Sequence, residues 1–272
     1  MRLVTFLHDG RERPGIVIDD RIHEINSHRD IKSALSELDK VDYDRSIAVS
    51  LAEATLLPPV TNPGKIICVG LNYDDHRRET KRPEVPYPTL FIRWADSHVG
   101  HMQPLLKPAQ SDRFDYEGEL AVVIGKPGRH ISKERALEHI AGYSCYNDGS
   151  VRDWQKHTSQ FTPGKNFTAS GAFGPWVVAK TIADPHKLTL TTRLNGVVVQ
   201  ESSTDLLIFD IPTLIAYIST FTNLSTGDVI VSGTPGGVGD RRDPPLYMRP
   251  GDVVDVEISN IGTLTNSVEQ AR

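Results

Sequence analysis

The sequence predicts an α+β fold in which strands predominate. Short runs of β-branched and apolar residues recur along the chain, and such runs are typical of strands. Segments with a helical pattern are few, and strands do not alternate regularly with helices, which disfavours a doubly wound parallel sheet. The runs that we expect to be strands are Arg2–Leu7, Gly15–Ile18, Lys65–Val69, Leu120–Ile124, Trp176–Ala179, Leu188–Leu194, Val197–Gln200, Asp228–Val231 and Val253–Ile258.

Turn and cap residues mark where several elements begin and end. Asn195-Gly196 separates two of the expected strands and is a strong signal for a hairpin turn. Helices are expected over Lys133–His139 and Ile211–Phe221, with Ser132 and Asp210 as their N-caps.

Residues 1–60 are expected to form a small N-terminal α/β domain. Their short strands are followed by a helical pattern near Asp30–Leu38. The chain breakers Pro58-Pro59 and Asn62-Pro63-Gly64 come next. We therefore place a domain boundary there and expect the main domain to span residues 61–272.

Composition favours an ordinary globular protein. Of 272 residues, 38% are hydrophobic and 24% are charged, and the net charge is -5, which gives no reason to expect nucleic acid or anionic membrane as a partner. No apolar run has the length of a membrane span, and Met1 to Gly10 lacks the apolar stretch of a signal peptide. Cys68 and Cys145 lie in apolar contexts typical of buried, reduced thiols. A cytoplasmic location is expected.

Three carboxylates form a candidate metal site. Glu117 and Glu119 are two apart at the start of an expected strand, so their side chains point to one side. Repulsion between them is relieved most simply by a divalent cation, and oxygen ligands suit Mg²⁺, Mn²⁺ or Ca²⁺. Asp148 is a candidate third ligand. The alternatives are a solvated strand end for the glutamates and a turn residue for Asp148.

A second group of residues suits acid–base chemistry and anion binding. His76 and Glu79 are three apart on an expected helix, where the carboxylate can orient the imidazole as a general base. The alternative is a solvated helix with its charges in water. Lys165 follows a Pro-Gly turn and reads either as a functional or as a surface lysine. Thr234 lies in a glycine-rich segment that lacks the pattern of a nucleotide loop but can present N–H groups and a hydroxyl to an anion.

Five motifs in one order resemble the fumarylacetoacetate hydrolase family. They are CVGLNYDDHRRE, DYEGELAVVIG, YNDGSVRDWQ, GKNF followed by FGPWVV, and GDVIVSGTPGGVG, and the resemblance runs from about Pro63 to Gly262. It is to short, acylpyruvase-like members. It implies a mixed β-roll catalytic domain over residues 61–272, a bound Mg²⁺ and a homodimer.

The resemblance also implies roles for individual residues. The metal ligands fall on Glu117, Glu119 and Asp148, and the catalytic residues fall on His76, Glu79 and Lys165. The residues that hold the substrate carboxylate fall on Arg152, Gln155 and Thr234.

The chain departs from the common family pattern near the expected substrate pocket. Thr168-Ala169 replaces an Asp-Thr pair, and Arg93-Trp94 replaces a Lys-Pro pair. Arg93 offers donors for a carboxylate or polyol, so we expect it to bind substrate. The segment from Asp74 to Gln103 is rich in proline and charge, and we expect a lid that closes over the substrate.

The function expected first is hydrolysis of a C–C bond in a 2,4-diketo acid, either acylpyruvate-like or sugar-derived. The products would be a 2-oxo acid and a carboxylic acid. Oxaloacetate-type decarboxylation and keto–enol isomerisation of an unsaturated 2-oxo dioic acid are the alternatives, because both use the same stabilised enolate. A non-catalytic protein that binds a small ligand on the same fold is an alternative of another class.

Overall fold

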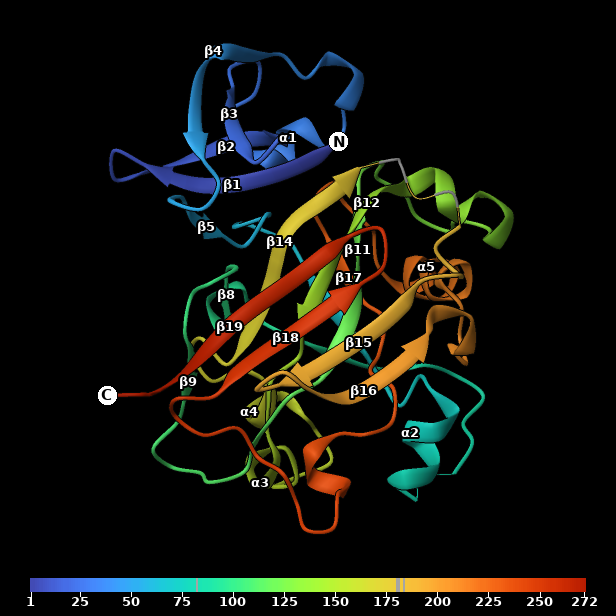
Figure 1. Ribbon diagram of the computed structural model, residues 1–272. Helices are drawn as coiled ribbons and strands as arrows, with labels where there is room; N and C mark the ends of the chain where they lie inside the picture. The colour runs from blue at the N-terminus through green and yellow to red at the C-terminus, as the bar shows by residue number, and fades with distance from the viewer. Residues whose placement is uncertain (82, 180–181, 183) are drawn as a thin grey trace.

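Two packed sheets form the bulk of the protein (Figure 1). The computed structural model describes residues 1–81, 83–179, 182 and 184–272, with the backbone alone at positions 46 and 47. The larger sheet has the strand order β4-β3-β2-β1-β14-β12-β11-β17-β6-β7, and the second has the order β16-β15-β18-β19-β9. This mainly β, α+β architecture confirms the predicted fold class.

Strand β11 (Gly118–Ile124) is buried along its whole length at the centre of the larger sheet. It pairs antiparallel with β12 (Ile140–Asn147) and β17 (Val229–Val231), and β17 pairs parallel with β6 (Ile66–Gly70). Side chains are packed against both faces of the sheet, which explains the continuous apolar run of β11. Further strands of this sheet are β7 (Thr89–Ile92), β8 (His98–Val99) and β14 (Gly171–Ala179).

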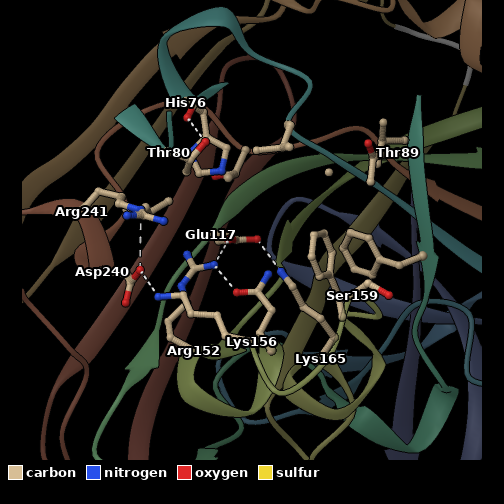
Figure 2. A pocket seen from close by; sticks show the side chains of 18 of the residues that line it. His76, Thr80, Thr89, Glu117, Arg152, Lys156, Ser159, Lys165, Asp240 and Arg241 are labelled. Atoms are coloured by element: carbon tan, nitrogen blue, oxygen red, sulfur yellow. Dashed lines mark hydrogen bonds and ion pairs between the residues drawn. The ribbon is translucent and has the colours of Figure 1, made fainter. Parts of the chain in front are cut away.

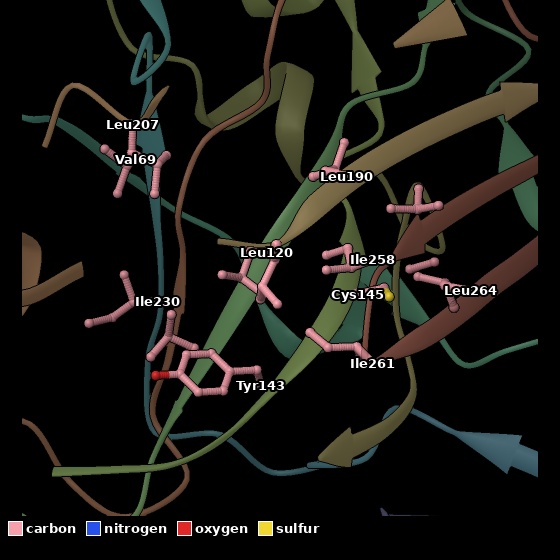
Figure 3. Packing of buried hydrophobic residues seen from close by; sticks show 14 of the residues in the cluster. Val69, Leu120, Tyr143, Cys145, Leu190, Leu207, Ile230, Ile258, Ile261 and Leu264 are labelled. Atoms are coloured by element: carbon pink, nitrogen blue, oxygen red, sulfur yellow. The ribbon is translucent and has the colours of Figure 1, made fainter. Parts of the chain in front are cut away.

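The second sheet lies over β11, β12 and β14, with the main hydrophobic core between the two layers (Figures 1 and 3). In that core Leu120 and Cys145 of the larger sheet pack with Leu190, Ile258 and Leu264 of the second. The strands of this sheet are β9 (Leu105–Lys107), β15 (Thr189–Leu194), β16 (Val197–Ser203), β18 (Val253–Ile258) and β19 (Gly262–Gln270). The hairpin predicted at Asn195-Gly196 joins β15 to β16.

The first sixty residues extend the larger sheet rather than standing apart from it. β1 pairs antiparallel with β14 through Arg2 and Leu3. Leu3 and Ile25 also belong to the core cluster that contains Val177 of β14. The predicted boundary near residue 60 therefore stays a prediction. The elements of this region are β1 (Arg2–His8), β2 (Arg11–Ile18), β3 (Arg21–Ile25), α1 (Ile31–Ala34), β4 (Tyr43–Ser50) and β5 (Thr55–Leu57).

One of the predicted α-helices is confirmed, and another segment forms a 3-10 helix instead. α5 (Ile211–Phe221) is confirmed, and the Asp210 carboxylate accepts a hydrogen bond from the Thr213 N–H at 2.8 Å. Lys133–His139 is a 3-10 helix, and Ser132 makes no capping hydrogen bond. Its buried residues Ala136 and His139 are three apart, a spacing that a 3-10 helix aligns on one face.

The helix predicted near Asp30–Leu38 is shorter than expected. α1 ends at Ala34, and a separate 3-10 turn covers Leu38–Lys40. The short helices near the cavity are α2 (Asp74–Glu79), α3 (Arg152–Gln155) and α4 (Thr162–Lys165). Short strands β10 (Phe114–Asp115) and β13 (Ser150–Val151) pair beside them. The remaining 3-10 turns are Ala95–Ser97, Thr204–Leu206 and Gly239–Arg241.

Cys68 and Cys145 are free and buried, as predicted. No helix in the described parts of the chain has the length and apolar character needed to cross a membrane.

Candidate active site and metal centre

A cavity of about 420 Å³ opens where β6, the start of β11, and helices α2, α3 and α4 converge (Figure 2). Charged side chains form much of its wall. Val69, Phe91 and Phe161 supply an apolar part. The cavity therefore suits a small molecule that carries both charge and a short carbon chain.

The three predicted metal ligands meet at one edge of this cavity. β11 and β12 are antiparallel, and Gly118 lies opposite Asn147. This register brings Glu117 and Glu119 next to Asp148. One ligand atom from each of the three carboxylates lies within 4.8 Å of the others, and all three side chains are buried. The alternatives of a solvated strand end and an ordinary turn residue do not fit this burial.

Cationic side chains surround two of the carboxylates. Lys165 Nζ lies 2.6 Å from Glu117 Oε2 and 2.6 Å from Asp148 Oδ2. The second oxygens are also occupied, because Arg152 Nη1 lies 2.7 Å from Glu117 Oε1 and Arg93 Nη1 lies 2.6 Å from Asp148 Oδ1. Burial raises the pKa of Glu117, but the charges of Arg152 and Lys165 outweigh burial and lower this pKa to about 2.

Glu119 lacks such compensation. Its Oε2 accepts a hydrogen bond from the Gly233 N–H at 2.5 Å, and it has no ion pair among the described residues. Burial raises the pKa of Glu119 well above its usual range, and the charges of Asp148 and Glu117 raise it further. A buried carboxylate beside two others is costly unless a cation joins it.

The donor set fits a hard divalent cation. Four buried carboxylates face three buried cationic side chains in this cluster, which leaves negative charge in excess. The carboxylates are those of Asp115, Glu117, Glu119 and Asp148, and the cations are Arg93, Arg152 and Lys165. Because the predicted ligand atoms are all carboxylate oxygens, Glu117, Glu119 and Asp148 could hold Mg²⁺ or Mn²⁺ more readily than a soft metal.

His76 and Glu79 lie together on α2 as the spacing predicts. His76 Nδ1 is 2.8 Å from Glu79 Oε1, and Glu79 Oε2 accepts a hydrogen bond from the Gly237 N–H at 3.0 Å. The His76 side chain is only 7% exposed and borders the cavity, so a fully solvated helix is ruled out. The Nδ1 contact leaves Nε2 available for a substrate.

Lys165 is a buried cavity residue and not a surface charge. Its side chain is 1% exposed. Burial lowers the pKa of Lys165, but the charges of Asp148 and Glu117 outweigh burial and raise it. The amine therefore stays protonated at neutral pH and supplies a fixed positive charge.

Arg152 and Gln155 of α3 both border the cavity, and Figure 2 shows Arg152 there. Arg152 Nε donates to Asp115 Oδ2 at 2.7 Å and its Nη1 donates to Gln155 Oε1 at 3.0 Å. Arg152 Nη2 is buried and has no hydrogen-bond partner within the described protein. Because Arg152 borders the cavity, its guanidinium group is suited to donate to a ligand carboxylate.

The two other predicted substrate contacts are placed differently. Thr234 borders the cavity, but its hydroxyl already donates to the Gly118 carbonyl at 3.0 Å and accepts from Gln200 Nε2 at 2.9 Å. The expectation that Arg93 binds substrate is wrong. Its side chain is fully buried behind Asp148 and does not border the cavity, and all its guanidinium nitrogens donate within the protein.

Sequence reasoning missed several residues of the site. Asp115 is buried and accepts hydrogen bonds from Arg152 and from the N–H groups of Gly239 and Asp240. Its position two residues before Glu117 is the signal that could have found it, because alternate residues of an extended segment share a side. Lys156 and Arg241 also border the cavity, and nothing in their sequence context singles them out.

Comparison with known proteins decides the family. The family described as fumarylacetoacetate (FAA) hydrolase C-terminal matches residues 65–269. The chain belongs to the fumarylacetoacetate hydrolase family. It is 42% identical over 241 residues to the mitochondrial oxaloacetate tautomerase fahd2 of Xenopus laevis, covering 88% of this chain and 74% of that protein. It is 44% identical over 220 residues to the human mitochondrial oxaloacetate tautomerase FAHD2A, covering 80% and 70% of the two chains.

Solved structures of fumarylacetoacetate hydrolase family enzymes share the whole fold. A fumarylacetoacetate hydrolase from Exiguobacterium antarcticum superposes with a TM-score of 0.89 at 37% identity, covering 100% of both chains. Maleylpyruvate hydrolase from Sphingobium sp. SYK-6, in complex with manganese(II) ion and pyruvate, superposes with a TM-score of 0.82 at 26% identity, again over 100% of both chains. The names of these two enzymes give fumarylacetoacetate and maleylpyruvate as the compounds that they hydrolyse.

Proposed function

We propose that this chain is a keto–enol tautomerase of a small 2-oxo dioic acid such as oxaloacetate. The observation that carries the proposal is that the His76 imidazole and the Lys165 ammonium border one cavity beside the buried carboxylates. One group can move a proton while the other holds the resulting enolate. Two similar proteins named oxaloacetate tautomerases support this choice over the hydrolysis expected first.

We assign a Mg²⁺ or Mn²⁺ site to Glu117, Glu119 and Asp148. When bound, such a cation supplies Lewis-acid stabilisation of the 2-oxo acid and its enolate. The negative excess at Glu119 and the all-oxygen donor set support the assignment.

Side chains of the protein bind the substrate and transfer the proton. Arg152 Nη2 and Gln155 hold a substrate carboxylate. His76, oriented by Glu79, removes a proton from carbon 3, and the electron pair shifts to the carbonyl oxygen, where Lys165 stabilises the negative charge. His76 then returns the proton to that oxygen, so that ketone becomes enol with no atom gained or lost.

The charge at one side of the cavity favours a second carboxylate. Lys156 and Arg241 both border the cavity and share one partner, Asp240, at 2.7 Å and 3.7 Å (Figure 2). Two cations against one carboxylate leave a positive charge in excess. This charge suits the distal carboxylate of a four-carbon dioic acid.

The test follows the absorbance of enol oxaloacetate as it converts to the ketone. We expect the protein with Mg²⁺ to accelerate the conversion well above the spontaneous rate, and EDTA to remove the acceleration. No acceleration with any divalent cation would overturn the proposal.

Hydrolysis of a 2,4-diketo acid is the second candidate. The His76–Glu79 pair also suits activation of a water molecule, and maleylpyruvate hydrolase shares the fold. Product analysis in ¹⁸O-labelled water separates the reactions, because a hydrolase places the label in the released carboxylic acid. Release of CO₂ from oxaloacetate as the fastest reaction would instead identify a decarboxylase.

We also propose a homodimer, as the family resemblance implies. Light scattering of the full chain in solution tests it, and a monomeric mass would contradict it.

A further inference from the structure

Every guanidinium nitrogen of Arg93 donates a hydrogen bond within the protein. Arg93 follows β7, and its side chain is 0% exposed. Its Nη1 donates to Asp148 Oδ1 at 2.6 Å and to the Gly149 carbonyl at 3.0 Å. Its Nη2 donates to Ser170 Oγ at 2.8 Å, and its Nε donates to Ser97 Oγ at 3.2 Å. This many fixed contacts hold the guanidinium in one orientation against Asp148.

The backbone is shaped around this guanidinium. A Cβ atom at Gly171 would lie 2.7 Å from Arg93 Cζ and 2.7 Å from its Nη2, closer than atoms of this kind pack. Glycine at position 171 therefore provides the space that Arg93 fills.

The same arrangement recurs at all three predicted ligands. Each carboxylate has one oxygen held by a donor from outside the metal site. Arg93 holds Asp148 Oδ1, Arg152 holds Glu117 Oε1, and the Gly233 N–H holds Glu119 Oε2. Each carboxylate therefore has at most one oxygen for a cation: Glu119 Oε1 has no partner among the described residues, and a cation would share Glu117 Oε2 and Asp148 Oδ2 with the Lys165 amine, which lies 2.6 Å from both.

We propose that Arg93 is a positioning residue that restricts Asp148 to one-oxygen ligation and so makes the site select Mg²⁺ or Mn²⁺ over Ca²⁺. The inference rests on the proposed metal site. Ca²⁺ takes six to eight oxygens and often binds carboxylates through both oxygens, whereas Mg²⁺ takes six at short distances. Three carboxylates that each offer a single oxygen suit the smaller ion.

Calorimetry of the substrate-free protein with MgCl₂ and with CaCl₂ tests this proposal. Wild type is expected to bind Mg²⁺ more tightly than Ca²⁺. Arg93→Gln removes the donor that fixes Asp148 Oδ1, so the ratio of the two affinities is expected to shift toward Ca²⁺ by about tenfold, comparable with the smallest affinity losses caused by removing a partner of a metal ligand. Loss of the Arg93 charge should change the affinities for Mg²⁺ and Ca²⁺ by the same factor, because both ions are divalent. A change in the ratio of the two affinities therefore reports the geometry of Asp148. An unchanged ratio in Arg93→Gln would overturn the proposal.

Two further variants separate positioning from general damage. Arg93→Lys keeps a donor for Asp148 and is expected to restore the wild-type ratio; a ratio like that of Arg93→Gln would contradict the assignment. Arg193→Gln removes an arginine from a separate pair with Glu257 and is expected to leave the ratio unchanged. If Arg93→Gln does not fold, the wild-type comparison decides, since tighter binding of Ca²⁺ than of Mg²⁺ would refute the proposal.

The readout is independent of the proposed reaction. Mg²⁺ selectivity without tautomerase activity would leave this inference standing and overturn the proposed function. Tautomerase activity with a preference for Ca²⁺ would do the reverse.

Discussion

At the residue scale, the contact between His76 and Glu79 orients the imidazole that we propose as the general base. Glu79 is fixed from both sides, by His76 Nδ1 at 2.8 Å and by the Gly237 N–H at 3.0 Å. His76→Gln is therefore expected to lower the tautomerisation rate by about 10²–10⁴-fold, the usual contribution of a general base. Glu79→Gln is expected to lower it in the same direction, because the imidazole loses its orienting carboxylate.

Stopped-flow absorbance with enol oxaloacetate measures both variants. Mg²⁺ affinity by calorimetry serves as the control and is expected to stay at the wild-type value, since neither residue is a proposed ligand. A wild-type rate in His76→Gln would exclude His76 as the base.

Arg241 is expected to set the preference for dioic acids. Its side chain is 36% exposed, so its contribution is that of a partly solvated charge, about 1 kcal/mol. Arg241→Gln should therefore raise KM for the dioic substrate about fivefold. KM for a 2-oxo monoacid of similar length should not change.

The ratio of the two KM values is the measurement for Arg241. Arg193→Gln again serves as the charge-matched control. An equal rise of KM for both substrates would show that Arg241 does not recognise the second carboxylate.

Sequence reasoning reached the residues of this site unevenly. Glu117 and Glu119 could be predicted from the sequence, because residues two apart on a strand point to the same face of the sheet. The burial of Arg93 behind Asp148 was not, since the two residues are 55 positions apart and meet only through the strand register that joins β6, β7 and β12 to the same sheet. A sequence does not distinguish an arginine whose guanidinium is free to bind a ligand from one whose nitrogens all donate hydrogen bonds within the protein.

At the element scale, the structure narrows the predicted lid. β7 pairs with β6 from Thr89 to Ile92, so that part of the segment is fixed in the sheet. Pro83 and Val85 border the cavity, and Tyr87 is 63% exposed. We therefore expect the mobile part of the predicted lid to include residues 83–88.

Hydrogen exchange tests this narrowed lid. Amides of Glu84, Val85 and Tyr87 are expected to exchange quickly in the free protein and to become protected when Mg²⁺ and oxalate, an unreactive analogue of a 2-oxo acid, are bound. Amides of β7 are expected to be protected in both states and serve as the internal reference. Equal protection of residues 83–88 with and without ligand would count against a lid.

Two of the predicted helices show when local sequence signals are enough to predict an α-helix. At Asp210 a capping carboxylate and an apolar helical pattern agree, and α5 begins where both predict. At Lys133–His139 the expected N-cap Ser132 makes no capping hydrogen bond, and the segment is a 3-10 helix. The capping contact that fixes the start of α5 is therefore missing in the second case.

At the scale of the whole molecule, the fold class was predictable and the placement of the first sixty residues was not. Strand content follows from residue type, because β-branched and apolar runs form strands wherever they pack. That Leu3 and Ile25 would share a core with Val177 depends on long-range pairing of β1 with β14. The sequence around the chain breakers at 58–64 contains no signal that predicts the pairing of β1 with β14.

The excess of buried carboxylate over cationic charge has a consequence for the stability of the entire fold. A cation that binds the folded state alone stabilises it by about 2.7 kcal/mol at one hundred times its Kd. For a domain of this size, each kcal/mol raises Tm by roughly 2–4 °C. Adding saturating Mg²⁺ after treatment with EDTA is therefore expected to raise Tm by about 5–10 °C, measured by scanning calorimetry.

Glu119→Gln is the matched variant for this measurement, because it removes the carboxylate that has no ion pair among the described residues and preserves its shape. In EDTA the variant should be at least as stable as wild type, since a buried, uncompensated charge is gone. It should also lose most of the response to Mg²⁺. A full Mg²⁺ response in Glu119→Gln would mean that the ion binds elsewhere, and the carboxylates of Glu117, Glu119 and Asp148 would then not form the metal site.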